Sequence, residues 1–345
     1  MKNMKKWHQV PKGTKIGAYT TIAEATGMAS YAVEKDWWVV RTLEIIFNME
    51  IGQHLVFKGG TSLSKAWGLI ERFSEDIDLA VDRNFLGFEG ELSKRQITKL
   101  RKAASSYIAE TFYPELRESF VANGLEGVEI KLIEAEDSDQ DPRIIEVYYP
   151  YTIESPGYVQ PRVQIEIGCR SLREPYTIRT FNSLVDEHYP DADFVQPSIN
   201  IPTVNPERTF LEKIFLLHEE FQRPKEKMRV DRLSRHLYDI SQLSGTNVFN
   251  KSIKDKELYE TITNHRFHFT KVGGVDYKLH QPKSINPIPP ESVIADWEKD
   301  YKTMQEQMIY GRSPSFKEII DTIGKLKSEI NSLGWEIDGP FNKSN

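Results

Sequence analysis

Two aspartates separated by one residue stand near the end of residues 57–81, which read FKGGTSLSKAWGLIERFSEDIDLAV. Residues 75–81 alternate between polar and apolar types, which predicts a β-strand. Successive side chains of a strand point to opposite faces, so Asp76 and Asp78 project to the same side. Carboxylates this close repel each other unless a cation lies between them, and Mg²⁺ binds through one or two carboxylates plus substrate phosphates. The pair therefore predicts a site for Mg²⁺ (or Mn²⁺), with a solvated acidic strand face as the alternative.

A glycine pair precedes the aspartates, at the end of the apolar run HLVF. Thr61 is the expected N-cap of a helix whose apolar face runs to Ile70. Gly59 and Gly60 leave backbone N–H groups uncovered, and a helix N-terminus adds partial positive charge, so this turn predicts a seat for phosphate. It is not a Walker P-loop, because G-x-x-x-x-G-K-[ST] is absent. The expected nucleotide contacts here are Lys58, Gly59, Gly60, Thr61, Ser62 and Ser74.

A third carboxylate stands in the strand-like run RVQIEIGCR, residues 162–170. Its apolar residues share one face, which leaves Gln164 and Glu166 on the other. If this strand lies beside the aspartate strand, Glu166 joins Asp76 and Asp78 as a metal ligand, whereas otherwise it is a surface residue. Three carboxylates on one or two metal ions, beside a phosphate seat, are typical of phosphoryl transfer, in which the metals bind the attacking and leaving oxygens.

Length and composition limit the classes of protein to consider. The chain has 345 residues, of which 39% are hydrophobic, and this suggests two domains with a sizeable core. The single cysteine, Cys169, excludes an internal disulfide and fits a reducing compartment. No signal-peptide core and no apolar run of about 18 residues is present, so we expect a cytoplasmic protein outside the membrane. With a formal net charge of −6, the chain is no general polyanion binder.

The order of predicted elements changes along the chain. The first part combines predicted helices at residues 31–48 and 91–112 with strands at 127–135, 143–151 and 162–170, whose succession suggests an antiparallel part of a sheet. After a proline-dotted stretch, helices are expected at residues 207–221, with Asn205 as N-cap, and at 230–244, 254–267, 291–310 and 315–333. We therefore expect an α+β catalytic domain at residues 1–200 and a helical domain at residues 201–345.

The glycine pair, the helix and the D-x-D strand resemble the core of the DNA polymerase β-like nucleotidyltransferase superfamily. The longer string FKGGTSLSKAWGLIERFSEDIDL, with EKDWW in the preceding helix, resembles the AbiEii/AbiGii toxin family of bacterial abortive-infection and type IV toxin–antitoxin systems. The resemblance is specific at residues 34–81, looser to about residue 170, and returns at 205–240. The 15 residues between Gly60 and Asp76 exceed the usual superfamily spacing and resemble the toxin branch.

This resemblance implies a polymerase β-like mixed sheet with helices and a helical C-terminal lobe. It also implies a toxin that blocks growth by transferring NMP from an NTP, with tRNA as acceptor, a cognate antitoxin as partner and a role in phage defence. Two alternatives remain open. One is a small-molecule nucleotidyltransferase of the antibiotic-modifying kind, and the other is a nucleotide-binding regulator without transfer activity.

Two later motifs, ERTFLEKIFLLHEE and RLSRHLYDI, resemble the later motifs of the same toxin family. The resemblance favours Lys213 as a contact to nucleotide phosphate, with a snorkelling lysine as the alternative. Asp239 matches the family aspartate and is expected to orient Arg235, or to share in metal binding or base catalysis. Arg235 is a further expected nucleotide contact. His236 stands where related sequences often have an acidic residue, and a neutral imidazole could serve as general base.

A local excess of basic residues surrounds the second of these motifs. Residues 223–235 hold six arginines and lysines against Glu226 and Asp231, on a chain that is acidic overall. Several of these cations lie near a helix start, where they oppose the helix dipole, so a triphosphate or an RNA backbone would be a favourable neighbour. A solvated charged loop is the alternative. Residues 264–271 (NHRFHFTK) mix rings with bases and could stack on nucleotides or belong to the core.

Overall fold

The computed structural model describes residues 4–74, 76–155 and 159–339 and divides into two compact units. The first unit comprises Met1–Gly68 and Phe73–Val204, and the second comprises Leu69–Arg72 and Asn205–Asn345. The division after Val204 lies close to the boundary expected near residue 200. The assignment of Leu69–Arg72 to the second unit was not foreseen. Glu75, the expected first residue of the aspartate strand, lies outside the described residues.

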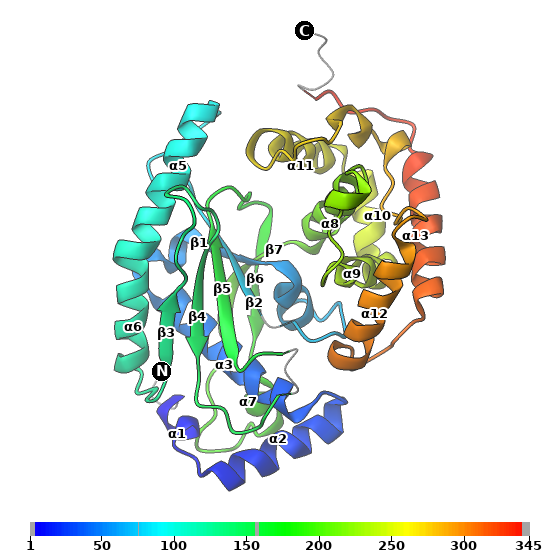
Figure 1. Ribbon diagram of the computed structural model, residues 1–345. Coiled ribbons are helices and arrows are strands. Elements are labelled where there is room, and N and C mark those ends of the chain that lie inside the picture. Colours follow the sequence, from blue (N-terminus) through cyan, green and yellow to red (C-terminus); the bar gives the residue numbers. More distant parts are fainter. Residues whose placement is uncertain (1–3, 75, 156–158, 340–345) are drawn as a thin grey trace. The chain divides into compact units, whose positions relative to one another are not determined.

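The first unit is built on a mixed seven-stranded sheet in the order β3-β4-β5-β2-β1-β7-β6 (Figure 1). β2 pairs with β5 and β1 with β7 in parallel, and the other pairs are antiparallel. The predicted antiparallel run is therefore confirmed as β3-β4-β5. The strands are β1 Leu55–Lys58, β2 Asp76–Val81, β3 Glu129–Leu132, β4 Arg143–Tyr148, β5 Arg162–Gly168, β6 Tyr176–Phe181 and β7 Ile199–Val204.

The strands β6 and β7 escaped sequence analysis for physical reasons. β7 contains Pro202, which lies opposite Ile178 of β6, and proline has no N–H to donate to a neighbouring strand. β6 is an edge strand with an exposed Ile178, so its burial pattern does not alternate regularly. A proline-dotted stretch thus contributes the strand that pairs with β1 on its second side.

One face of the sheet is apolar and buried. Ile77 and Leu79 of β2 and Ile165 and Ile167 of β5 are all fully buried, and α3 (Ser30–Asn48) packs against both strands. The alternation that predicted these strands is confirmed by alternating burial from Asp76 to Leu79 and from Arg162 to Ile167. The other helices of this unit are α1 Met4–His8, α2 Lys12–Thr26, α5 Lys94–Tyr107, α6 Tyr113–Ala122 and α7 Leu184–His188.

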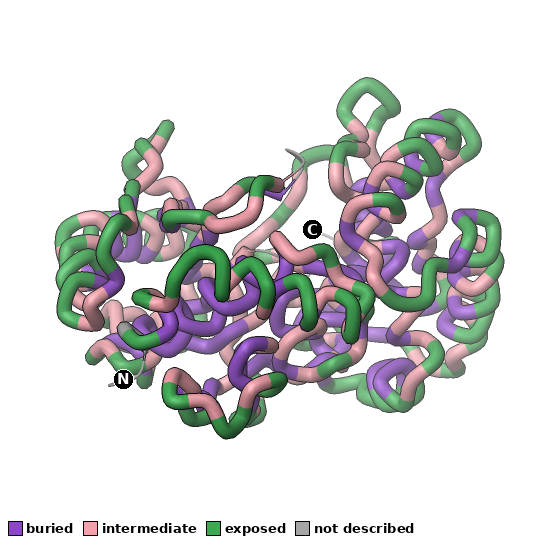
Figure 2. The backbone as a smooth tube through the Cα atoms, turned by 90° about the horizontal axis from the view of Figure 1, so that it is seen from below, coloured by how far each residue is buried: buried purple, intermediate pink, exposed green. Residues whose placement is uncertain are grey.

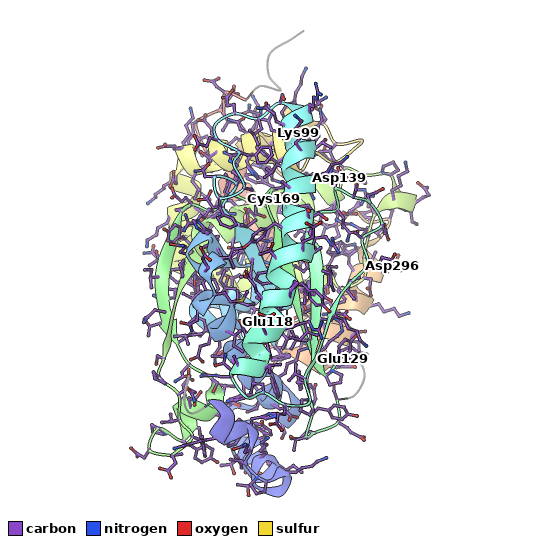
Figure 3. The ribbon with its side chains drawn as sticks, turned by 90° about the vertical axis from the view of Figure 1, so that its left-hand side faces the viewer. Lys99, Glu118, Glu129, Asp139, Cys169 and Asp296 are labelled. Atoms are coloured by element: carbon purple, nitrogen blue, oxygen red, sulfur yellow. The ribbon has the colours of Figure 1, made fainter. Side chains whose placement is uncertain are left out.

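The helix expected at residues 91–112 is longer than predicted. It begins after the capping box of Ser93 and continues through the π-helical turn η3 (Ile108–Phe112) into α6. Lys99 and Glu118 lie on this continuous helical column (Figure 3). Pro114 did not stop it, because proline is tolerated in the first turn of a new helical segment, here α6.

The helix after β1 differs from the prediction. The helical turns are α4 (Gly59–Thr61) and the π-helical η2 (Ser62–Ala66), and the N-cap is Lys58, so the prediction of Thr61 as N-cap was wrong. Thr61 is already helical, and its buried hydroxyl is bound to the strand that follows. The helix ends at Ala66, and Ile70 belongs to the second unit rather than to its apolar face.

The second unit is helical, as the sequence predicted. Its helices are α8 Pro206–Glu220, α9 Ser234–Ser244, α10 Asn247–Lys254, α11 Lys256–Phe269, α12 Ile294–Met308 and α13 Phe316–Asn331. Asn205 is the N-cap of α8 and Pro206 its first residue, as expected. Among the α-helices in the described part of this unit, α10 is the one that was not predicted. Phe210, Ile214 and Leu217 of α8 are fully buried, and such interior residues of both units are drawn purple in Figure 2.

Within the described part of the chain, none of the helices combines the length and the apolar character that crossing a membrane requires.

Candidate active site

The structure brings the three predicted carboxylates to one face of two neighbouring strands. In the parallel pair of β2 and β5, Asp76 lies opposite Gln164 and Asp78 lies opposite Glu166. All four side chains are partly exposed, whereas the residues between them face the buried side. The condition set by the sequence, that the strand of Glu166 lies beside the strand of the aspartates, is met.

The glycine turn and the aspartates form one arrangement. Lys58 lies opposite Asp78 in the antiparallel pair of β1 and β2, so the chain enters the turn beside this carboxylate. Gly59 has φ +82°, and a Cβ atom on it would lie 1.9 Å from Oδ2 of Asp78. Only glycine satisfies both conditions, because any Cβ would collide with the carboxylate and L-residues rarely adopt this φ. Gly60 follows, also partly exposed.

The hydroxyls of the turn bind the protein itself. The Thr61 hydroxyl donates to the carbonyl oxygen of Asp76 at 2.5 Å and lies 3.0 Å from the Ser74 hydroxyl. The Ser62 hydroxyl donates to the carbonyl oxygen of Gly59 at 2.9 Å. Thr61 and Ser62 are both buried, so in this structure they fix the turn against the start of β2. Ser74 takes part in the same contact, ahead of the aspartates.

The residues of the EKDWW run connect α3 to surrounding loops. Glu34 accepts hydrogen bonds from the backbone N–H groups of Thr152 and Ile153, and Lys35 donates to the Gln160 carbonyl. Asp36 pairs with Lys65 of η2, with 2.9 Å between Oδ1 and Nζ. Burial raises the pKa of Glu34, and the hydrogen bonds from the loop oppose this rise. The motif thus anchors the chain segment that leads into β5.

A second cluster of predicted residues lies inside the second unit, around Asp239. Arg72 donates to both carboxylate oxygens of Asp239, with distances of 2.7 Å from Nε and 2.8 Å from Nη2. Lys213 Nζ lies 3.0 Å from Oδ2 of the same carboxylate. Burial by itself raises the pKa of Asp239, but the charges of Arg72 and Lys213 outweigh it and hold that pKa below its usual value.

This geometry corrects the expected partner of Asp239. Among the described residues, the hydrogen bonds of its carboxylate come from Arg72 and its ion pairs from Arg72 and Lys213, rather than from Arg235. Asp239 is fully buried, and the buried cations Arg72 and Lys213 satisfy its carboxylate.

Lys213 also fixes the state of His236. Its Nζ lies 3.2 Å from Nδ1 of His236, and since an ammonium only donates, Nδ1 accepts and the ring proton is on Nε2. Burial, together with the charges of Lys213 and Arg235, lowers the pKa of His236 well below its usual value. Burial also lowers the pKa of Lys213, an effect that Asp239 opposes. A histidine so hard to protonate is a poor general base.

Sequence reasoning missed Arg72, which is buried and lies four residues before Asp76. Its segment is held within the second unit, because Glu71 accepts backbone hydrogen bonds from Tyr310 at 3.0 Å and Gly311 at 3.3 Å. The sequence offered little signal, because Arg72 stands beside Glu71 and close to Asp76 and so resembles an ordinary charged residue. No pattern within residues 57–81 identifies the buried aspartate that pairs with it.

Two arginines of the basic segment at residues 223–235 pair with the buried Glu220. Glu220 lies 2.9 Å from Arg223 Nη1 and 2.8 Å from Arg229 Nη2, and it also accepts from the Arg229 backbone N–H. Asp300 accepts from the backbone N–H groups of Arg232 and Ser234 at the start of α9. A carboxylate of the protein thus occupies the position at the helix start where an external anion was expected.

The rings of residues 264–271 also have partners inside the second unit. His265 stacks on Phe269 with ring centroids 4.7 Å apart, and the Lys271 ammonium lies 4.4 Å from the centroid of Phe267. Arg266 forms a two-point ion pair with the buried Glu219. Burial raises the pKa of Glu219, but Arg266 and His280 outweigh it and lower that pKa to about 2. These rings thus have partners within the second unit and are partly exposed rather than buried in its core.

The donor set on the sheet face suits a hard divalent cation, because carboxylate oxygens are the ligands that Mg²⁺ and Mn²⁺ prefer. The carboxylates are turned toward protein groups: Asp78 Oδ2 lies against Gly59, and Glu166 Oε1 accepts from Gln164. Over the described ranges, no three His, Cys, Asp or Glu side chains are gathered around one point as a metal site. The sheet face therefore carries oxygen donors of the kind that a hard divalent cation prefers.

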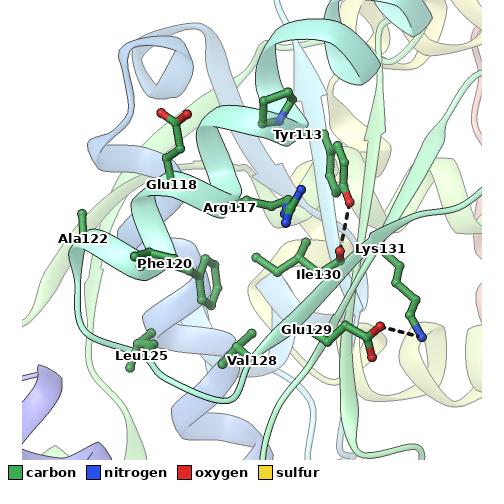
Figure 4. Close-up of a pocket in the computed structure, with 12 residues that line it drawn as sticks. Tyr113, Arg117, Glu118, Phe120, Ala122, Leu125, Val128, Glu129, Ile130 and Lys131 are labelled. Carbon is green, nitrogen blue, oxygen red and sulfur yellow. Dashed lines mark hydrogen bonds and ion pairs between the residues drawn. The ribbon is translucent and has the colours of Figure 1, made fainter.

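A groove elsewhere in the first unit contains none of the predicted site residues. It lies between α6 and the edge strand β3, has a volume of about 890 Å³, and includes Phe120, Leu125 and Val128 in its lining (Figure 4). Tyr113 donates to the carbonyl oxygen of Ile130 at 3.0 Å across it. The groove is therefore separate from the face that carries the carboxylates.

Comparison with known proteins gives a consistent result. A family model described as nucleotidyl transferase AbiEii toxin, type IV TA system, matches residues 41–322. MenT4, a nucleotidyltransferase toxin from Mycobacterium tuberculosis H37Rv, is similar in structure with a TM-score of 0.52 and 16% identity, covering 94% of this chain and 90% of that chain. At this identity the similarity supports the fold. No match is found among curated protein sequences.

Two Helicobacter pylori structures are more distant. JHP933 has a TM-score of 0.45 and 12% identity over 88% of this chain and 93% of that chain. A putative nucleotidyltransferase has a TM-score of 0.44 and 11% identity over 88% of this chain and 96% of that chain.

Proposed function

Because the chain belongs to the AbiEii nucleotidyltransferase toxin family of type IV toxin–antitoxin systems, we propose that this nucleotidyltransferase transfers an NMP group from an NTP to a hydroxyl of RNA, with tRNA as acceptor. In this reaction the acceptor oxygen forms a bond to the α-phosphorus, the bond to the bridging oxygen breaks, and pyrophosphate leaves. The observation that carries the proposal is the contact of Asp78 with the glycine turn on one side and its register with Glu166 on the other.

Asp76, Asp78 and Glu166 would hold Mg²⁺ or Mn²⁺, since their three carboxylates share one partly exposed sheet face. A bound ion at this place would supply positive charge to the phosphates. The carboxylates themselves would fix where the α-phosphate lies relative to the acceptor hydroxyl. Neighbouring strands make this arrangement rigid, because the backbone ladder sets the spacing of the three residues.

The turn at Gly59 and Gly60 would bind the outer phosphates of the NTP. Backbone N–H groups without side chains can approach a phosphate closely, and the glycine that makes room for Asp78 keeps metal ligand and phosphate seat adjacent. Lys58 would add charge, since it lies opposite Asp78 and is partly exposed. Thr61 and Ser74 would support the shape of this turn through their mutual contact, and Ser62 through its hydrogen bond to the Gly59 carbonyl.

For the second unit we propose an electrostatic contribution from Lys213 and Arg235. The buried group of Arg72, Lys213 and Asp239 contains two cations and one carboxylate, so it carries a net positive charge. The nearby Arg235 charge adds to this, as the lowered pKa of His236 reflects. Such a group favours a polyanionic nucleotide, with Asp239 holding the two cations in place rather than acting as base.

The wider biological role follows from the family. A toxin of a type IV system is accompanied by a cognate antitoxin, and we propose that transfer to tRNA stops growth in the cytoplasm and contributes to phage defence. The NTP and the RNA acceptor are the substrates that the proposed chemistry requires.

Incubation of the purified protein with each radiolabelled NTP, Mg²⁺ and total tRNA tests the proposal. Label on RNA supports it. Label on a small-molecule acceptor supplied in parallel would favour an antibiotic-type transferase, and nucleotide bound but not consumed would favour a regulator. Transfer that persists in the Asp76→Asn and Asp78→Asn variants would contradict the roles assigned to the carboxylates.

A further inference from the structure

A continuous row of polar contacts leads along the sheet face to Glu166. The Tyr148 hydroxyl donates to Glu146 Oε2 at 2.5 Å, and Arg162 Nη1 lies 2.8 Å from Glu146 Oε1. The same Arg162 nitrogen donates to Gln164 Oε1 at 2.7 Å, and Gln164 Nε2 donates to Glu166 Oε1 at 2.9 Å. The row starts on β4 and follows β5 to the carboxylate that faces Asp78.

Arg162 determines which way the amide of Gln164 points. A guanidinium can only donate, so the amide oxygen must face it, and the amide NH₂ is then directed to the other neighbour. That neighbour is Glu166, whose carboxylate can only accept while it is ionised. The orientation of the amide, which distances alone do not define, therefore follows from the chemistry of its two neighbours.

We infer that Gln164 is a positioning residue for Glu166, which holds the third carboxylate in the conformation that the reaction needs. The inference rests on the proposed function, in which Glu166 joins the aspartates. A glutamate has one more rotatable bond than an aspartate, so Glu166 needs a fixing partner more than Asp76 and Asp78 do. Outer hydrogen bonds of this kind orient ligating carboxylates in metal sites.

The location of Gln164 argues against a purely structural role. Its side chain is partly exposed, on the face opposite the buried Val163 and Ile165. It lies in register with Asp76, one step along the same face from the pair of Asp78 and Glu166. A partly exposed amide contributes little to folding stability, yet it fixes a neighbour that would otherwise sample several rotamers.

The test compares Gln164→Met with wild type in two measurements. Methionine keeps the length and volume of the side chain but removes both hydrogen bonds. The first measurement is Mn²⁺ affinity, followed by electron paramagnetic resonance of the free ion, and we expect a loss of about 10- to 100-fold. The second is steady-state kinetics, in which kcat should fall by a similar factor with little change in KM for the NTP. The melting temperature should stay close to that of wild type.

Gln305→Met is the matched control, because Gln305 is a partly exposed glutamine in α12 whose amide donates to the Pro314 carbonyl. It should leave Mn²⁺ affinity and kcat unchanged. If Gln164→Met keeps both values while Asp78→Asn loses both, the inference is overturned and the proposed function stands. If Gln164→Met loses activity only in proportion to a lower melting temperature, the residue is structural and the inference is again overturned. A wild type that neither binds Mn²⁺ nor transfers label would refute both proposals together.

Discussion

One acidic site in each of the two units has surroundings opposite to those of the other. On the sheet of the first unit, Asp78 and Glu166 are partly exposed, and each touches an uncharged group, Gly59 for one and the Gln164 amide for the other. In the second unit Asp239 is fully buried, and both its oxygens are engaged by Arg72 and Lys213. The first site is thus partly exposed, and the second is closed by the protein's own cations.

This difference predicts that mutations at the two sites have different effects. A partly exposed carboxylate keeps much of its hydration and has little effect on folding, so its loss should appear mainly in activity. A buried ion pair behaves differently, because removal of one partner leaves the other charge desolvated without compensation. Replacement of the same residue type, aspartate, is therefore predicted to have opposite effects at the two sites: on activity at the first and on stability at the second.

The largest expected effect is the loss of transfer on the sheet face. Asp76→Asn and Asp78→Asn should each lower kcat about 10³-fold or more, since they remove charge at the proposed reaction centre. The free energy of unfolding should change by less than about 1 kcal/mol, because the replaced groups are partly exposed. Rapid-quench transfer assays and urea unfolding measure the two quantities. A variant that unfolds readily and keeps its specific activity would contradict this prediction, because these carboxylates would then contribute to stability rather than to activity.

The next effect is on stability, at the buried cluster. Asp239→Asn should lower the free energy of unfolding by about 3–5 kcal/mol, because Arg72 and Lys213 would remain buried without a counter-charge. Asp321→Asn is the control, an exposed aspartate in the middle of α13, and it should change the free energy by less than about 0.5 kcal/mol. Denaturant titration of both variants provides the measurement. Equal stability of the Asp239→Asn and Asp321→Asn variants would show that Asp239 does not compensate the buried charges of Arg72 and Lys213.

The same carboxylate should make the protein sensitive to acid. The pKa of Asp239 is held below its ordinary value of 3.8, so the unfolded chain binds its proton at a higher pH than the folded chain does. Its contribution to stability is therefore complete above about pH 4–5 and is lost as the pH falls through the unfolded pKa toward the folded one. Stability against pH, compared between wild type and Asp239→Asn, should show a shallower acid decline in the variant.

A third effect links the glycine turn to the aspartate. Gly59→Ala should lower the free energy of unfolding by about 1–3 kcal/mol and also reduce activity, because its Cβ would displace the Asp78 carboxylate. Gly68→Ala is a matched control, since Gly68 also has a positive φ, +63°, but its Cβ would meet open space. The control carries only the cost of the backbone conformation. Equal activity of both variants would mean that the contact with Asp78 is irrelevant to the reaction.

The carboxylate face could be predicted from the sequence because its signals are local. Alternation placed Asp76 and Asp78 on one side of a strand, and the same rule placed Gln164 and Glu166 on one side of another. The prediction for Glu166 depended on the condition that these two strands pair. The sequence did not show this pairing, but the resemblance to a known family supported it. The contact of Gly59 with Asp78 was not foreseen, since it depends on the register of β1 with β2.

The cluster around Asp239 could not be predicted in the same way. Its partner Arg72 lies 167 residues away in sequence and belongs to a four-residue segment of the second unit, which interrupts the first. Asp239 was expected to orient Arg235, and no local pattern revealed that the buried Arg72 and Lys213 would be its partners instead. Likewise, the strand β7 next to β1 could not be predicted. Its proline lowers the local strand propensity, although pairing within the sheet makes this segment a strand.

The smallest expected effect lies at Thr61, whose hydroxyl ties the glycine turn to the start of β2. Thr61→Val keeps the shape of the side chain and removes its hydrogen bond to the Asp76 carbonyl, which should lower the free energy of unfolding by about 0.5–1.5 kcal/mol. Thr61→Ser retains the hydroxyl and is the control. If the tie also positions Asp76, the valine variant should lose more activity than the serine variant at equal folded fraction. Equal activity would mean that the Thr61 hydroxyl contributes to folding only. The positions of the carboxylates on the sheet face would then depend on Gly59 and on the pairing of the strands.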